Sequence, residues 1–101
     1  MYLTPHSVDR AKERGIPNYI VKLATDLKSN YSCIEFAKNN HKKRIFHSIN
    51  LEFALFDDQI TKYEYSLLKD LCLVLNHDET TLITLYKYTE PNYEKNYEKI
   101  A

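Results

Sequence analysis

The sequence predicts an α+β domain in which two N-terminal helices pack on a twisted antiparallel sheet of about four strands. Apolar residues recur at helical spacing in the first 28 residues, whereas alternating and β-branched runs dominate the later ones. Of the 101 residues, 44% are hydrophobic and 28% are charged, a balance that supports one folded core. We therefore expect a single domain over residues 1–90.

Two helices are expected near the start of the chain. Thr4 and Pro5 form a helix start, because threonine caps the first turn and proline suits the first helical position. Gly15, the one glycine in the sequence, suits the left-handed residue that ends a helix. A second, amphipathic helix is predicted from about residue 18 to residue 28. Its apolar face consists of Ile20, Leu23, Ala24 and Leu27.

Two strands joined by a tight turn are predicted next, over residues 31–37 and 42–49. Asn39–Asn40 separates the two runs, and asparagine tolerates the left-handed conformation that tight turns need. With these two residues as the turn, Glu35 faces Arg44. A cross-strand ion pair would then explain why an arginine stands at this position.

The segment over residues 50–69 fits a strand slightly better than a helix. Leu51, Phe53 and Leu55 alternate with other residues, as in a strand with one buried face, and Asp57–Asp58 marks a turn. The stretch after that turn fits either state.

The clearest hairpin of the chain pairs residues 71–75 with residues 80–88. Both runs are rich in Leu, Val, Ile, Thr and Tyr, and the polar residues 76–79 form the turn between them. We expect this hairpin at the centre of the sheet.

A tail rich in Tyr, Lys and Glu follows over residues 91–101 and is predicted as either a short helix or a disordered segment. A Tyr-Glu-Lys motif repeats there at a spacing of four, so a helix would place Tyr93 and Tyr97 on one face. Because tyrosine is enriched at protein interfaces, both are candidate partner-binding residues.

The charge of the chain is balanced overall but not along its length. Its 14 basic and 14 acidic residues argue against a general nucleic-acid coat protein. Residues 1–50 hold nine Lys and Arg against four Asp and Glu, whereas residues 51–101 hold five against ten. One half could therefore meet phosphate, and the other a basic partner.

Cofactors, metals and membranes are not expected. Cys33 and Cys72 lie in separate apolar runs, too few and too far apart for a disulfide framework or a zinc knuckle, and we interpret both as reduced core thiols. No run approaches the roughly 18 apolar residues of a membrane span. The N-terminus lacks the apolar core of a signal peptide, so a cytoplasmic protein is expected.

One pattern near the N-terminus could carry chemistry. His6, Arg10 and Arg14 recur at a spacing of four, which places them on nearly one face of a helix. Two guanidinium groups suit phosphate, and histidine exchanges protons near neutral pH. The alternative is a solvated stripe in which Asp9 and Glu13 pair with the arginines.

The run from His6 to Ile16 resembles the opening His-Ala-x-x-Arg-x-x-x-Arg-Gly-Ile of a small prokaryotic domain family of unknown function, related to BrnT-like and RelE-like toxins. The strand over residues 71–75 and the run Leu82-Ile83-Thr84-Leu85-Tyr86 are similar to the closing hairpin of that family. The resemblance covers the first 28 or so residues and about the last 20 of the folded part.

The resemblance implies a RelE-like fold, shared with barnase, EndoU and the colicin nucleases, whose members are often metal-independent ribonucleases. In such enzymes the ribose 2′-hydroxyl attacks the adjacent phosphate, which requires a base, an acid and cations. The resemblance implies that His6 transfers the proton and that Arg10 and Arg14 bind phosphate.

Two residues of the last strand would complete that site. The resemblance implies that Ile83 and Leu85 face the core and that Thr84 and Tyr86 lie on the opposite face. There Tyr86 could stack on a base or orient the phosphate. Both are also ordinary strand residues.

A further basic run, Lys42, Lys43 and Arg44, could follow an RNA backbone, although charged residues near a hairpin tip are commonly just solvated. His47 shares a face with apolar residues in the expected hairpin and is interpreted as a core histidine.

Two classes of function follow. The first is a toxin-type ribonuclease that cuts RNA or ribosome-bound mRNA and is restrained by an antitoxin. The second is a non-catalytic phage or mobile-element protein of the same fold that binds and inhibits a host protein, such as a defence protein; a homodimer is left open in both. Convergence of His6, Arg10, Arg14 and Tyr86 on an open cleft would favour the first class. Pairing of the arginines with Asp9, Glu13 or other carboxylates inside the core or a dimer interface would favour the second.

Overall fold

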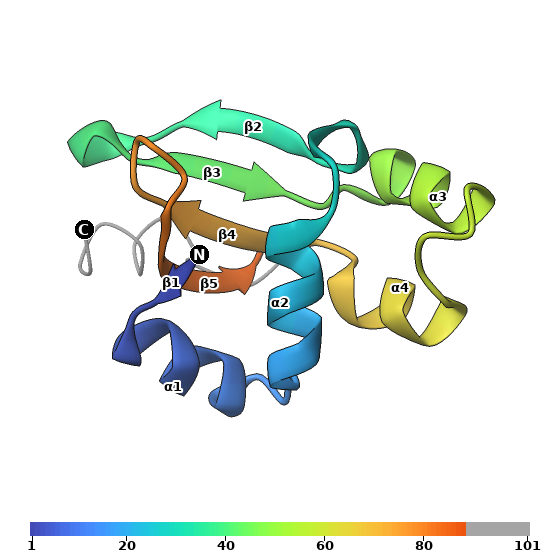
Figure 1. Ribbon diagram of the computed structural model, residues 1–101, viewed down its shortest axis with the longest axis horizontal. Coiled ribbons are helices and arrows are strands. Elements are labelled where there is room, and N and C mark those ends of the chain that lie inside the picture. The colour runs from blue at the N-terminus through green and yellow to red at the C-terminus, as the bar shows by residue number, and fades with distance from the viewer. Residues whose placement is uncertain (89–101) are drawn as a thin grey trace.

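The computed structural model describes residues 1–88, in which helices and a five-stranded sheet confirm the α+β class (Figure 1). The tail, with Tyr93 and Tyr97, lies outside the described residues. The strands are β1 (Tyr2–Leu3), β2 (Cys33–Phe36), β3 (Lys42–Ile45), β4 (Leu71–Leu75) and β5 (Thr81–Lys87). The α-helices are α1 (Pro5–Glu13), α2 (Asn18–Asp26), α3 (Ser48–Phe56) and α4 (Lys62–Leu68), and the short 3₁₀ helices are η1 (Ser29–Tyr31) and η2 (Lys38–Asn40).

The sheet has the order β1-β5-β4-β3-β2, one strand more than expected. The additional strand is β1, which pairs with β5 in parallel, whereas the other neighbours are antiparallel. Thr4 follows β1 and has two roles. Its hydroxyl accepts a hydrogen bond from the Ser7 backbone N–H at 3.1 Å, as the predicted cap of α1, and donates to the Ile83 carbonyl at 2.8 Å. The start of α1 is thereby fastened to β5.

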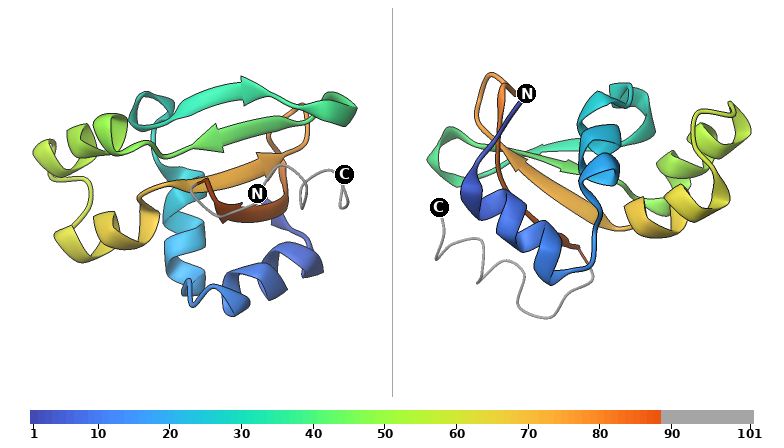
Figure 2. Two further views of the ribbon diagram at one scale, coloured as in Figure 1. Left: turned by 180° about the vertical axis from the view of Figure 1, so that it is seen from behind. Right: turned by 60° about the horizontal axis from the view of Figure 1, so that its bottom comes forward.

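Helices α1 and α2 cover one face of the sheet, as the views in Figures 1 and 2 agree, and α3 and α4 stand at one end of it. The apolar face predicted for α2 packs into the core, where Ile20 and Ala24 are fully buried. The helix ends at Asp26, two residues before the predicted end. The core on this face also contains Ala11, Leu51, Ala54, Leu68, Leu73, Leu75, Leu82 and Leu85.

The predicted turn between β2 and β3 is one residue too short. Asn39 and Asn40 do have left-handed φ angles of 58° and 60°. However, the loop is closed by a hydrogen bond from the Ala37 backbone N–H to the His41 carbonyl at 2.9 Å, so it contains three residues rather than two. A change of one residue in the loop moves every pair in the hairpin by one position.

The observed register therefore excludes the expected ion pair. Glu35 pairs with Lys43, and Arg44 pairs with Ile34. Because side chains alternate between the two faces of a strand, Arg44 points to the face that carries α2, away from Glu35.

The strand favoured for residues 50–69 is wrong, because this segment forms most of α3 and all of α4. In α3, Leu51 and Ala54 are fully buried at a helical spacing of three, whereas Phe53 is exposed. Helix α4 begins with a reciprocal capping box between Thr61 and Glu64.

The hairpin of β4 and β5 is confirmed, with β4 in the middle of the sheet. The pairing is irregular between Val74 and Leu75, so that Ile83 is the extra residue of a bulge. Leu82 therefore faces the main core in place of Ile83, while Leu85 faces it as predicted. The opposite face carries a second apolar cluster formed by Ile45, Cys72, Val74 and Tyr86.

Helices α1 and α3 have the same length of nine residues and end in the same hydrogen-bonding motif. The residue after the C-cap is left-handed in both: Gly15 has φ 66° and Asp58 has φ 56°. Its N–H donates to the carbonyl three residues earlier, at 3.0 Å after α1 and 3.1 Å after α3. The next N–H donates to the carbonyl five residues earlier, at 2.8 Å in both helices. This is the Schellman arrangement.

Candidate functional site

The charged stripe predicted on α1 exists as a connected group of side chains. Arg10 Nε donates to His6 Nε2 at 3.4 Å. Arg10 Nη1 lies 3.0 Å from Glu13 Oε2, and Arg14 Nη1 lies 3.8 Å from the same oxygen. The two guanidinium groups thus share one carboxylate, whose side chain is 58% exposed.

The rest of α1 determines where this stripe points. Ser7 and Ala11 are buried between the helix and the sheet, and Val8 lines a groove of about 290 Å³ together with residues of α2. Successive residues turn by about 100° around a helix. His6 and Arg10 therefore lie on the flank of α1 that points away from α2, and both are half-buried.

The residues predicted on β5 are not on an open surface. Thr84 is fully buried and Tyr86 is 2% exposed, and both lie on the face of the sheet opposite α1 and α2. The Thr84 hydroxyl has no hydrogen-bond partner among residues 1–88. The four residues that we expected to converge on a cleft are thus divided. His6 and Arg10 lie on a half-buried helix flank, the Arg14 side chain is only 15% exposed, and Tyr86 lies on a buried strand face.

The basic run on β3 does not form one cationic surface either. Lys42 Nζ lies 3.4 Å from Glu79 Oε2, in a half-buried ion pair across the sheet. Lys43 and Arg44 are both buried, on opposite faces of an internal strand.

Two cations on the sheet instead lie at the C-terminal ends of helices. Arg44 Nη1 donates to the carbonyls of Ala24, Thr25 and Leu27 at 3.4 Å each. Lys87 Nζ donates to the carbonyls of Leu67 and Lys69 at the end of α4, at 2.7 and 2.9 Å. The end of a helix carries partial negative charge and unpaired carbonyls, so a cation there is favourable.

Burial changes the proton affinity of both cations. It lowers the pKa of Arg44 from its ordinary value, an effect that the negative charge of Glu79 partly opposes. It also lowers the pKa of Lys87, whereas nearby Asp70 acts in the opposite direction. These shifts follow from structural roles and do not mark a catalytic group.

A surface that the sequence interpretation missed lies on α3. Ile49, Phe53 and Phe56 are 70%, 59% and 86% exposed. With Glu52 and Asp57 they line an open groove of about 480 Å³, which we call the α3 groove. A helix that is apolar on both its buried and its exposed side is typical of a covered helix. That double apolar character is the sequence signal that could have revealed the groove.

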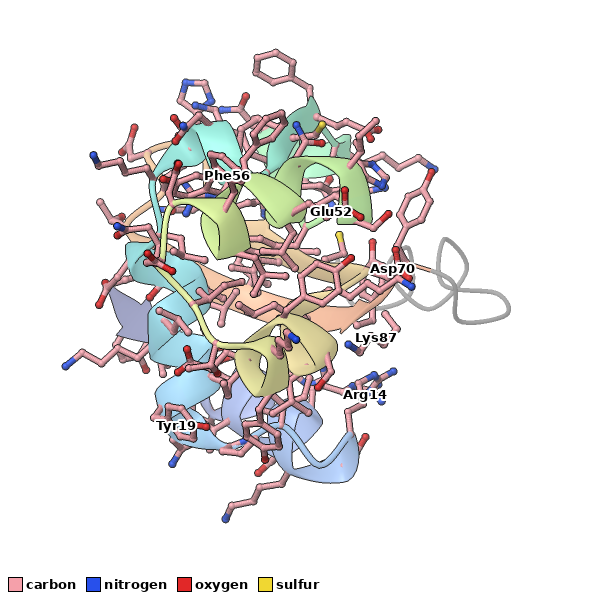
Figure 3. All side chains as sticks on the ribbon, turned by 90° about the vertical axis from the view of Figure 1, so that its right-hand side faces the viewer. Arg14, Tyr19, Glu52, Phe56, Asp70 and Lys87 are labelled. Atoms are coloured by element: carbon pink, nitrogen blue, oxygen red, sulfur yellow. The ribbon has the colours of Figure 1, made fainter. Side chains whose placement is uncertain are left out.

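The C-terminal end of α3 is held by a contact with η1. The Tyr31 hydroxyl donates to Asp57 Oδ2 at 2.7 Å. This hydrogen bond is the largest cause, and burial the second, of a pKa of Tyr31 raised above its ordinary value. The rim of the α3 groove is therefore fixed to the body of the domain. Figure 3 shows Glu52 and Phe56 on α3 and Arg14 at a separate place on the same side of the molecule.

Cys33 and Cys72 form no disulfide with each other. Cys72 is buried, as expected of a core thiol, and Cys33 is half-buried with its Sγ donating to Asn50 Oδ1 at 3.3 Å. His47 is half-buried at the cap of α3, with its ring edge-to-face against Tyr88 at 5.2 Å.

Within residues 1–88, no three His, Cys, Asp or Glu side chains gather as ligands of a metal ion. In the same residues, every helix is too short or too polar to cross a lipid bilayer.

Comparison of the chain with protein-family models, curated proteins and solved structures found no match.

Proposed function

We propose that this protein is a metal-independent ribonuclease of the RelE/BrnT-like toxin type, acting on RNA or ribosome-bound mRNA in the cytoplasm. The observation that carries the proposal is the flank of α1 on which His6, Arg10 and Arg14 are connected through hydrogen bonds and a shared carboxylate. Two N-terminal helices on a largely antiparallel sheet also agree with the fold that the resemblance implies.

The pairing of the arginines with Glu13 does not prevent phosphate binding. An exposed ion pair contributes only about 0–1 kcal/mol, and Glu13 is largely solvated. A phosphate makes the same kind of charge-assisted hydrogen bond and offers a separate oxygen to each guanidinium group, whereas Glu13 offers one oxygen to both. RNA phosphate can therefore displace Glu13 from Arg10 and Arg14.

The arrangement suits the first step of RNA cleavage. His6 Nε2 accepts a hydrogen bond from Arg10, so this nitrogen carries a lone pair on the side of the guanidinium. In the proposed reaction Arg10 turns from His6 to the phosphate, and the lone pair of Nε2 that this releases takes the proton of the 2′-hydroxyl as that oxygen attacks phosphorus. The bond to the 5′-oxygen breaks, the leaving oxygen takes a proton from solvent, and a 2′,3′-cyclic phosphate forms. The arginines stabilise the charge that develops on the phosphoryl oxygens.

The test is induced expression in a bacterial host, followed by growth measurement and analysis of total RNA. We expect growth arrest and RNA fragments with cyclic phosphate ends for the wild type. The His6→Ala, Arg10→Ala double variant should grow normally with intact RNA. Lys12→Ala is the matched control, because Lys12 is an exposed cation on the other flank of the same helix. Equal toxicity of the wild type and the double variant would place the activity elsewhere.

Two observations favour a second candidate, the non-catalytic protein that binds a host partner. Tyr86 is buried on the other face of the sheet and does not meet His6, Arg10 and Arg14 in an open cleft. Large apolar side chains are exposed on α3, and such patches mark protein-binding surfaces. Normal growth and intact RNA in cells that contain soluble wild-type protein would support this candidate over the ribonuclease.

A further inference from the structure

The α3 groove combines an apolar floor with an acidic border. Ile49, Phe53 and Phe56 occupy positions i, i+4 and i+7 of one helix and therefore form one continuous stripe. Glu52 and Asp57 line the same groove. The stripe and its border thus present both an apolar and an electrostatic feature to a partner.

The two charged residues that line the groove are both acidic. Residues 45–61 contain Glu52, Asp57 and Asp58 and no Lys or Arg. Asp58 is exposed directly after the helix. A partner that covers the apolar stripe must bring its own flanking groups next to these carboxylates, which favours Lys and Arg at those positions.

A symmetric dimer in which two α3 grooves face each other is disfavoured. In a two-fold symmetric dimer the same surface meets itself, so the acidic border of one α3 groove would lie against that of the other. With no Lys or Arg in residues 45–61, nothing in that segment would neutralise the repulsion.

The shape of the surface favours a helical partner. All residues that line the groove come from α3 and its C-cap, so the partner packs across a single helix of nine residues, about 13.5 Å long at 1.5 Å per residue. Side chains at i, i+4 and i+7 interdigitate with the same spacing on a second helix.

We propose that the α3 groove binds an amphipathic helix of another protein, in which an apolar stripe is flanked by Lys and Arg. This site is separate from the α1 flank, so the proposal does not depend on RNA cleavage.

The test is selection from a displayed library of amphipathic helices whose apolar positions are fixed and whose flanking positions are randomised over Lys, Glu and Gln. The wild-type chain is the target, and the Phe53→Ala, Phe56→Ala double variant is the counter-target. We expect enrichment of Lys at the flanking positions on the wild type and no enrichment on the double variant.

The affinity of one selected peptide for purified variants then measures each contribution. Phe56→Ala and Glu52→Lys should each weaken binding by about tenfold or more, as expected for groups at the centre and border of an interface. Phe36→Ala is the matched control, because Phe36 is 80% exposed on β2 and outside the groove. Its affinity should equal that of the wild type.

Three results would overturn the proposal. Enrichment of Glu or Gln would show that the border does not select a basic partner. Absence of any enrichment on the folded wild-type chain would show that the groove binds no such helix. Concentration-dependent dimerisation that Phe56→Ala abolishes would show that a second copy occupies the groove.

Discussion

Helices α1 and α3 have equal length and the same C-terminal motif, yet their outward-facing sides differ in chemistry. On α1 the side chains of His6, Arg10, Glu13 and Arg14 contact one another. On α3 the stripe is apolar and exposed to water. The charged side chains of α1 pair with one another. The apolar side chains of α3 have no such pairing, and their burial by a partner would be favourable.

Because of this difference, the two helices are suited to binding partners of different kinds. The α1 flank is suited to an ion that exchanges with Glu13, since the exposed ion pairs that it replaces contribute little to stability. The α3 groove is suited to a larger partner, because burying a Phe or Ile side chain contributes about 1.5–3 kcal/mol. Neither surface is needed for the fold, which is what the following substitutions test.

The largest expected effect distinguishes the two sides of α3. Leu51→Ala should lower the free energy of unfolding by about 2–5 kcal/mol, because it leaves a cavity in the core beneath the helix. Phe56→Ala, on the exposed side, should change it by less than about 0.5 kcal/mol. Urea unfolding followed by circular dichroism measures both. A large loss for Phe56→Ala would mean that the groove belongs to the core.

An intermediate effect is expected for the arginines. Arg44→Met should destabilise the fold by about 1–3 kcal/mol, because it leaves the carbonyls of Ala24, Thr25 and Leu27 without this donor while keeping most of the side-chain volume. Arg10→Met on α1 should change stability by no more than about 0.5 kcal/mol. The same unfolding measurement applies, and equal losses would contradict the distinction between an arginine bound to a helix end and an arginine in an exposed ion pair.

The smallest effect concerns the shared motif at the helix ends. Gly15→Ala should cost about 1 kcal/mol of folding free energy, because alanine is strained at positive φ. A Cβ there meets no other atom within 4 Å, so no steric clash adds to this cost. Asp58→Gly should instead stabilise the fold by about 0.5 kcal/mol, since it removes both strain and a negative charge from a helix C-terminus. Asp58→Asn separates the two causes, because it removes the charge alone. Thermal unfolding should show changes of opposite sign for Gly15→Ala and Asp58→Gly.

Local rules predicted the first 15 residues and the last hairpin of the described part of the chain well. The cap at Thr4, the left-handed Gly15 and the β4–β5 hairpin are all observed, because each depends on neighbouring residues. The strand β1 was not predicted, because its two residues are held by pairing with β5 at the far end of the chain. Such distant pairing leaves no local pattern.

The middle of the chain could not be predicted by the same rules. Leu51, Phe53 and Leu55 alternate as in a strand, but Phe53 is apolar without being buried, which conceals the helical period. In the hairpin, the conformations of Asn39 and Asn40 were correct, but one additional loop residue placed Arg44 on the other face. The role of that arginine depends on the end of α2, which a strand pattern does not reveal.

The candidate site was predicted in part for related reasons. The α1 stripe follows from helical spacing and was found, whereas the burial of Thr84 and Tyr86 depends on the packing of the whole sheet. The resemblance implied the correct face for these two residues and could not predict whether that face is accessible.

The pairing of β1 with β5 also governs the order in which the domain can form during synthesis. Helix α1 leaves the ribosome early, but the strand on which it docks is the last element of the sheet to be made. Until residues 81–87 emerge, Ala11 and the apolar side of α2 have no complete surface to bury against. These apolar residues therefore lack their full docking surface until β5 is available, a state in which chaperone binding and premature association compete with folding.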